Sequence, residues 1–345
     1  MVKRLKVLTA FAAVAAGCQP NLNDTTSVVT TPTILAVQSS PAEAPPQGNV
    51  SYTALVVDAS GELPAAPVLW SYCNARNPLS NLGPVAPQCV QAGASSLQSI
   101  GVGQSASSPI PELACTNFGP NPPSAMAGQP AGSPVDPDST GGYYQPVTLF
   151  LPEASGTQIL LYDMRLSCGF AGANEAGQAE LLARYHLNTN PSVASLTAAG
   201  APLVNDSGGQ TNAAAAGQTL ELEVAWPTCP LVDVCGDGVC GADESAMSCP
   251  VDCKTPHGCA GAERYVNFDL ATQSVLDARE SIQVSWYATA GTFVNDSTGR
   301  ASSDTAVTSE DGWQAPAQPG TVHLWVVLHD ARGGIGWAGY VLDVN

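Results

Sequence analysis

Basic residues are scarce in this 345-residue chain, which has 11 Lys and Arg against 29 Asp and Glu and a formal net charge of −18. Lys3, Arg4 and Lys6 lie within the first six residues, and Lys254 is the only later lysine. A surface of this charge repels phosphate backbones and anionic lipid headgroups, so nucleic-acid binding is excluded. Charged residues are nevertheless only 12% of the chain, which indicates a folded protein and not an acidic disordered tail.

Long apolar runs are also missing. The longest, Val7–Ala16, is about half of the roughly 20 residues that a membrane-spanning helix needs. Because basic residues precede this run and small residues follow it, residues 1–17 are predicted to be a signal peptide. Residues 18–32 are polar and rich in Thr, Ser and Asn, and we expect them to form a tether.

The end of this leader carries a short motif. Ala15-Ala16-Gly17-Cys18 resembles the lipobox of bacterial lipoproteins, in which the cysteine is acylated and becomes the new N-terminus. The resemblance covers the first 18 residues and implies that Cys18 carries a lipid. Gln19 stands where many lipoproteins retained in the inner membrane have Asp, so we expect an outer-membrane anchor, on the periplasmic face or the cell surface. The alternative is an ordinary cleaved signal followed by an unmodified Cys18.

Several motifs of catalysis and nucleotide binding are absent. The sequence contains no Gly-x-Ser-x-Gly, His-Glu-x-x-His or P-loop pattern. Only four histidines are present: His186, His257, His323 and His329. We therefore expect no enzymatic activity; the alternative is an enzyme of unknown class whose catalytic groups converge from distant loops.

Alternating apolar and polar residues predict strands through most of the chain, most clearly at 220–226 and 322–328. We predict an all-β protein with two immunoglobulin-like antiparallel β-sandwiches, at residues 33–188 and 189–345. The first is expected to contain a Pro/Gly/Ser-rich, disulfide-stapled insertion at 74–142, and the second a cysteine-rich insertion at 229–259. Residues 176–187 are expected to close the first sandwich as a strand, although their leucine spacing also suits a helix.

The layout of a lipobox, Ig-like domains and a Cys-Gly-Asp-Gly motif beginning at Cys235 resembles that of uncharacterised surface lipoproteins of myxobacterial type. This resemblance implies an envelope location but no activity. We expect a structural or binding role, with a membrane contact through the lipid and an envelope polysaccharide or a surface protein as candidate partner.

The 11 cysteines become ten when Cys18 is set aside, an even set that suits five disulfides in an exported protein. A Cys229–Cys259 bridge would close the second insertion at its neck. In the first sandwich we expect Cys73 to pair with Cys168 and Cys89 with Cys115. Within the second insertion the sequence does not choose among pairings of the remaining four: Cys235, Cys240, Cys249 and Cys253.

The second insertion also has the spacing of part of a calcium loop. With Asp233 as position 1, Asp237 falls at 5, Gly238 at 6 and Glu244 at 12, as in an EF-hand, but Cys235 stands at position 3. We expect a calcium site drawn from five carboxylates: Asp233, Asp237, Asp243, Glu244 and Asp252. The alternatives are solvated carboxylates held by disulfides alone, and a zinc site that uses the cysteines and His257.

A second candidate surface lies on the strands near the C-terminus. If Val322, Leu324, Val326 and Leu328 face the core, the opposite face carries aromatic side chains that suit stacking on a sugar ring or contact with a protein. The candidate residues are His323, Trp325, His329 and Trp337. The alternative is that the first domain or the cysteine-rich insertion covers this face.

Overall fold

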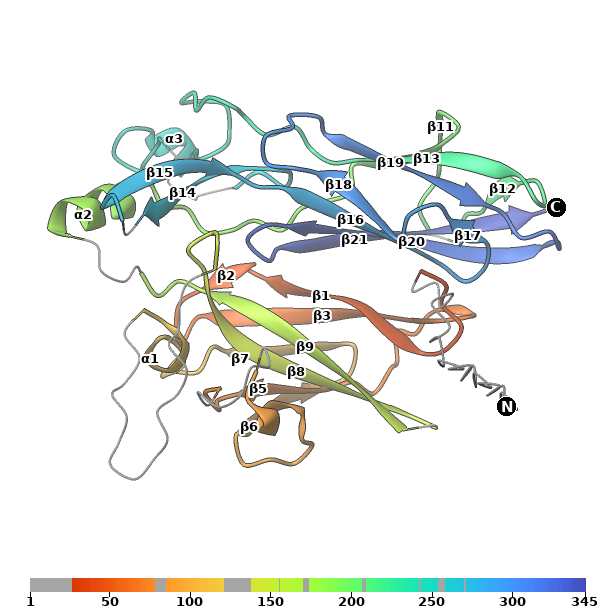
Figure 1. The fold of residues 1–345 in the computed structure, drawn as a ribbon, viewed down its shortest axis with the longest axis horizontal. Coiled ribbons are helices and arrows are strands. Elements are labelled where there is room, and N and C mark those ends of the chain that lie inside the picture. The colour runs from red at the N-terminus through yellow and green to blue at the C-terminus, as the bar shows by residue number, and fades with distance from the viewer. Residues whose placement is uncertain are drawn as a thin grey trace, which may run out of the picture.

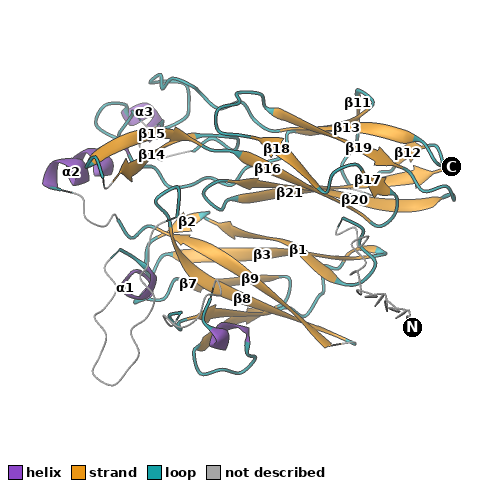
Figure 2. Ribbon diagram, viewed as in Figure 1, coloured by secondary structure: helices purple, strands orange, loops and turns teal. Residues whose placement is uncertain are grey.

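The computed structural model describes residues 27–77, 85–120, 138–154, 156–169, 174–206, 209–241, 243–253, 258–269 and 271–345. The predicted signal peptide, Cys18 and His257 lie outside the described residues. The protein is all-β, and two sandwiches lie one above the other with their strands running in similar directions (Figures 1 and 2). This confirms the predicted fold class.

The first sandwich has two sheets. In one, β1 pairs with β3, which also pairs with β4 and β7; the bounds are Thr33–Ser40, Asn49–Asp58, Gly61–Glu62 and Ser105–Pro109. The other has the order β2-β9-β8-β5-β6, with bounds Glu43–Ala44, Gly156–Leu166, Tyr143–Glu153, Leu69–Cys73 and Leu97–Val102. Trp70 of β5 is fully buried between them. The centroid of its ring lies 5.9 Å from that of Tyr52 on β3.

The expected insertion at 74–142 is partly wrong, because two of its segments are strands of the sandwich. β6 extends the sheet at β5, and β7 extends the other sheet at β3. Their Ser, Ala and Gly residues have little strand propensity, and as strands at the ends of their sheets they bury only part of their side chains. The helices described in this region are short: η1 spans Pro87–Val90 and α1 spans Ala114–Phe118.

The second sandwich also has two sheets. One has the order β11-β10-β13-β19-β17, with bounds Ala201–Pro202, Ser195–Ala198, Thr219–Ala225, Thr308–Gln314 and Thr292–Phe293. The other has the order β12-β21-β20-β16-β18, with bounds Asn212–Ala214, Ile335–Val344, Gly320–Asp330, Ile282–Ala288 and Ser297–Arg300. The predicted alternation is realised in β13, where Leu220, Leu222 and Val224 are buried and Glu221 is exposed.

The hairpin β14 (Arg264–Asp269) and β15 (Ser274–Arg279) projects beyond the second sandwich and carries helix α2 (Glu175–Arg184) (Figure 1). Helix α2 replaces the strand expected at 176–187. The Asn174 side chain caps it by accepting from the Gly177 N–H, and Leu181 packs on Val266 and Phe268 of the hairpin. A capped, one-sided apolar helix therefore satisfies this segment better than a strand would.

Strand β20 joins the two sandwiches because both of its faces are buried. Leu324, Val326 and Leu328 belong to the core of the second sandwich, whereas Trp325 and Val327 belong to the core cluster of the first. The segment at the predicted domain boundary is buried as well, since the Asn188 N–H donates to Glu43 at 3.1 Å and its amide lies 3.2 Å from Asp330. We call this contact between the sandwiches the seam.

Part of the predicted tether is also fixed in place. Ser27 and Val29 are buried, and their backbones exchange hydrogen bonds with Ala288 of β16. The Ser27 hydroxyl donates to Asp296 at 2.5 Å. The end of the tether therefore packs on the second sandwich before the chain enters the first.

Candidate functional site

Five disulfides join all ten cysteines that follow Cys18: Cys73–Cys89, Cys115–Cys168, Cys229–Cys259, Cys235–Cys249 and Cys240–Cys253. The Cys229–Cys259 bridge closes the insertion as predicted. The expected Cys73–Cys168 and Cys89–Cys115 pairs are wrong. Helix η1 contains Cys89, which is bonded to Cys73 at the end of β5, and α1 contains Cys115, which is bonded to Cys168 just after β9. No thiolate among these ten is left for zinc.

The cysteine-rich insertion depends on its crosslinks because it has little core. Met247 is 95% exposed, and Val232 and Val251 are also largely exposed. Its described helix, α3, spans only Pro250–Cys253. A segment that buries so few apolar side chains needs covalent bridges to hold one conformation.

Two of the five predicted calcium ligands instead form ion pairs with arginines. Asp233 lies 3.2 Å from Arg264. Asp243 lies 2.8 Å from Arg184 of α2 and 3.5 Å from Arg264, and both arginines also pair with Asp277 of β15. These aspartates attach the insertion to α2 and to the hairpin, so their negative charge is already compensated.

Asp237, the residue at calcium-loop position 5, lies in an exposed turn of its own. Its Oδ1 accepts the Val239 N–H at 2.9 Å, which is the usual role of Asp in a turn. It is not part of the group that gathers around Glu244. The EF-hand spacing therefore does not produce EF-hand geometry.

Glu244 and Asp252 are the two predicted ligands that come together. Each is 5% exposed, and each has a carboxylate oxygen in a group whose ligand atoms, together with the Cys235 and Cys249 sulfurs, all lie within 4.8 Å of one another. Among the described residues, this is the one group of three or more potential metal ligands that is so close. Its two sulfurs belong to a disulfide, so only the two carboxylates have metal-binding character.

The aromatic face predicted on β20 is not exposed, and the alternative that the first domain covers it is correct for Trp325. Trp325 is 1% exposed within the core cluster of the first sandwich. His323 stacks on it at 6.0 Å and lies against Gly61 of β4. His329 is half-buried, and burial lowers its pKa below the usual value.

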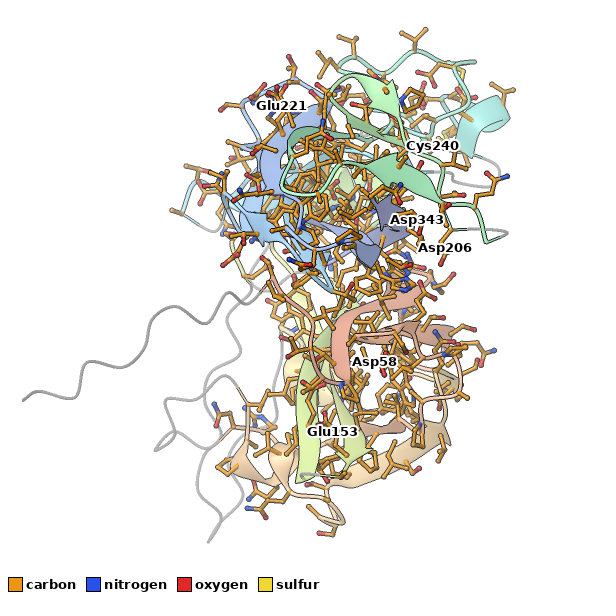
Figure 3. All side chains as sticks on the ribbon, turned by 90° about the vertical axis from the view of Figure 1, so that its right-hand side faces the viewer. Asp58, Glu153, Asp206, Glu221, Cys240 and Asp343 are labelled. Carbon is orange, nitrogen blue, oxygen red and sulfur yellow. A yellow bond between two sulfur atoms is a disulfide. The ribbon has the colours of Figure 1, made fainter. Side chains whose placement is uncertain are left out.

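Trp337 is the member of this set that borders an open space. It lines a cleft of about 320 Å³ at the seam, together with Glu62, Asn205 and Asp206. Figure 3 shows Asp206 on the part of the second sandwich that faces the first. Burial, with the nearby charge of Asp206, raises the pKa of Glu62 above its usual value.

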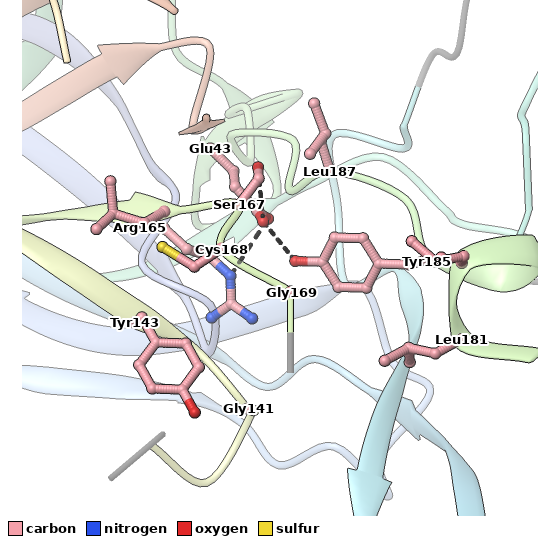
Figure 4. Close-up of a pocket in the computed structure, with 12 residues that line it drawn as sticks. Glu43, Gly141, Tyr143, Arg165, Ser167, Cys168, Gly169, Leu181, Tyr185 and Leu187 are labelled. Carbon is pink, nitrogen blue, oxygen red and sulfur yellow. Dashed lines mark hydrogen bonds and ion pairs between the residues drawn. The ribbon is translucent and has the colours of Figure 1, made fainter. Parts of the chain in front are cut away.

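Charged residues buried at the seam are the feature that the sequence did not predict. Arg165 lies 3.3 Å from Glu43, and Ser167 and Tyr185 donate to the same carboxylate (Figure 4). Next to them, Arg332 pairs with Glu280 at 2.7 Å and with Glu263. In the sequence, Arg165 and Arg332 each stand near the end of a strand between apolar or turn residues, in a chain with few basic residues. This pattern is the signal that could have indicated buried arginines.

A small cavity of about 170 Å³ lies beside Glu43 and Arg165, walled by leucines, Tyr143 and Tyr185 (Figure 4). Its polar groups are already engaged, because Arg165 also donates to Thr140 and Tyr144 and both oxygens of Glu43 accept hydrogen bonds. The volume is below the roughly 300 Å³ at which ligand pockets begin. We interpret it as an internal void left by side-chain packing and not as a ligand site.

No family model matches the chain, and no curated protein matches it in sequence. Among solved structures, a chimeric titin Z1Z2 is similar at 10% identity and a TM-score of 0.16, covering 92% of this chain and 97% of titin Z1Z2. The adhesin InvE of Yersinia pseudotuberculosis is similar at 10% identity and a TM-score of 0.21, covering 90% of this chain and 58% of InvE. Latent PorU of Porphyromonas gingivalis is similar at 11% identity and a TM-score of 0.19, covering 92% of this chain and 34% of PorU.

Among the described residues, no helix has the length and apolar character needed to cross a bilayer.

Proposed function

We propose that this chain is a non-enzymatic, lipid-anchored protein of the bacterial outer membrane that acts as a stiff structural or binding element of the cell envelope. The observation that carries the proposal is β20, whose two faces belong to two different cores. A strand shared in this way opposes bending between the sandwiches, whereas domains joined only by a linker move independently.

Two further features support an exported location. Disulfides persist in oxidising compartments and are rare in the cytosol, and this chain has five. The leader ends in the lipobox-like Ala15-Ala16-Gly17-Cys18. Because the rest of the chain is strongly acidic and is repelled by anionic headgroups, a covalent lipid suits it better than adsorption to the membrane surface.

The anchor is tested by expressing the full chain in a Gram-negative host with an alkyne-labelled fatty acid. The wild type should incorporate the label and fractionate with the outer membrane, and Cys18→Ser should lose both properties. Gln19→Asp is the matched variant: it should keep the label but move to the inner membrane. A mature chain whose mass shows an unacylated Cys18 would overturn the proposal.

The seam cleft favours a second candidate function, recognition of an envelope polysaccharide. The half-buried Trp337 offers a ring on which a sugar can stack, and Glu62 and Asp206 offer acceptors for its hydroxyl groups. Trp337→Ala should weaken retention on envelope polysaccharide, and Trp337→Phe should preserve most of it. Equal retention of wild type and Trp337→Ala would reject this role.

A further inference from the structure

Glu244 has a buried oxygen with no partner among the residues that the structure describes. Its Oε2 accepts the Gly241 N–H at 3.1 Å, but Oε1 is enclosed and forms no hydrogen bond, and the residue is 95% buried. Leaving a buried polar group unsatisfied costs about 1–3 kcal/mol, and more for a charged one. A carboxylate in this position therefore requires a partner that the described residues do not supply.

Asp252 places a second carboxylate beside it. Its oxygens accept the N–H groups of Gly236 at 2.5 Å and Gly238 at 3.1 Å, and one of them lies within 4.8 Å of a Glu244 oxygen. Within the part of the chain that the structure describes, neither carboxylate forms an ion pair. The nearby arginines, Arg184 and Arg264, are already paired with Asp233, Asp243 and Asp277.

We propose that Glu244 and Asp252 bind one divalent cation, Ca²⁺, within the disulfide frame of the insertion. Two adjacent buried carboxylates repel each other unless a cation or a proton lies between them. Calcium accepts carboxylates, backbone carbonyls and water in flexible numbers. The sulfurs beside them are oxidised, so they offer nothing to a soft metal such as zinc.

The number of carboxylates and their exposure to solvent determine how tightly Glu244 and Asp252 bind calcium. Two carboxylates are few for calcium, so affinity should resemble that of extracellular modules, a Kd of about 10⁻⁴–10⁻³ M. Cys235, on one side of the group, is exposed, which gives the ion a route from solvent. The inference rests on the proposed envelope location, because calcium at such concentrations is found outside the cytosol.

The test uses the purified mature chain with its disulfides intact and follows calcium binding by calorimetry and thermal unfolding with and without EGTA. Wild type should release or absorb heat with one equivalent and lose Tm when EGTA is added. Glu244→Gln should weaken the Kd at least tenfold. Asp237→Asn, in the same loop and at the EF-hand-like position, should leave the Kd within twofold.

Three outcomes would overturn the proposal. The first is a wild type that shows neither heat nor an EGTA-sensitive Tm. The second is a Glu244→Gln protein that binds calcium like the wild type. The third is a Glu244→Gln protein that melts higher than the wild type while calcium has no effect on either, since this would mean that a proton neutralises the pair.

Two controls separate these outcomes from other failures. If Glu244→Gln does not fold, Asp252→Asn and the wild-type titration still decide the question. Fatty-acid labelling at Cys18 is measured on the same variants. A chain that is acylated but binds no calcium would refute this site alone, and an unacylated chain would refute the envelope anchor.

Discussion

At the scale of single residues, Arg332 is the centre of an unusual buried cluster. Its guanidinium is 1% exposed, pairs with Glu280 and Glu263, donates to the His186 carbonyl at 3.2 Å and lies 4.9 Å from the ring of Tyr265. Asp330 is buried next to it. Three carboxylates thus surround one cation, and burial raises the pKa of all three above their usual values.

These raised pKa values predict an uncommon pH dependence. A carboxyl whose pKa is higher in the folded state than in the unfolded state binds protons more tightly when folded, so its contribution to stability is present below the unfolded pKa and is lost as pH rises through the folded pKa. The unfolded value for Glu280 is near 4.5. We expect the free energy of unfolding, measured by urea titration, to decrease as the pH rises from about 4.5 towards 7.

The variant that tests this assignment is Glu280→Gln, which removes the proton-binding group but keeps its shape. It should be less stable by about 3–5 kcal/mol, because it breaks a buried ion pair, and its stability should depend less on pH. Glu221→Gln, on an exposed position of β13, is the control and should retain the wild-type pH profile. A Glu280→Gln variant with the full wild-type pH dependence would show that other groups are responsible.

At the scale of elements, β20 is unusual because the first sandwich covers the face that points away from its own core. A strand of an antiparallel sheet commonly has one buried and one solvated face, and the alternation around Leu324 predicts only that one face is buried. The other face is covered by the first sandwich, which packs over Trp325 and Val327. The predicted binding face is therefore mainly an intramolecular contact.

Trp325→Ala should destabilise the protein by about 3–5 kcal/mol in urea unfolding, because it empties a fully buried site. Trp337→Ala is the matched substitution on the neighbouring strand β21. It should cost less, since Trp337 is only half-buried and borders the cleft. Equal losses for the two variants would contradict the burial of Trp325 in the seam.

The two disulfides of the first sandwich differ in the length of chain they close. Cys115–Cys168 spans 53 positions and Cys73–Cys89 spans 16, so restriction of the unfolded chain predicts contributions of about 4 and about 3 kcal/mol. Replacing each pair with Ala should lower the free energy of unfolding by these amounts. Peptide mapping that linked Cys73 to Cys168 would contradict both the pairing and the ranking.

At the scale of the whole molecule, the seam should make the two sandwiches unfold together. We expect calorimetry of the mature chain to show one transition, with a calorimetric enthalpy equal to the van't Hoff enthalpy. Trp325→Ala weakens the contact and should broaden or split the transition. Two separate transitions in the wild type would show that the sandwiches are independent and would remove the main support for a stiff envelope element.

The sequence by itself determined the strand-rich fold class, the number of sandwiches and the covalent closure of the insertion at Cys229 and Cys259. These follow from local signals. Side chains alternate along a strand every two residues, and cysteines at the two ends of an insertion, where the flanking strands end, are close enough to pair. The calcium-loop spacing was also local, but it selected Asp237, which the fold leaves in a solvated turn.

Only the tertiary structure decided which residues from distant segments meet. It paired Cys115 with Cys168, placed β6 and β7 in the sheets, covered Trp325 and gathered Glu43, Arg165 and Arg332 at the seam. It also separated Glu244 and Asp252 from the aspartates that pair with arginines. Burial and charge compensation depend on contacts between positions that are often more than a hundred residues apart, and no periodicity along the chain encodes those contacts.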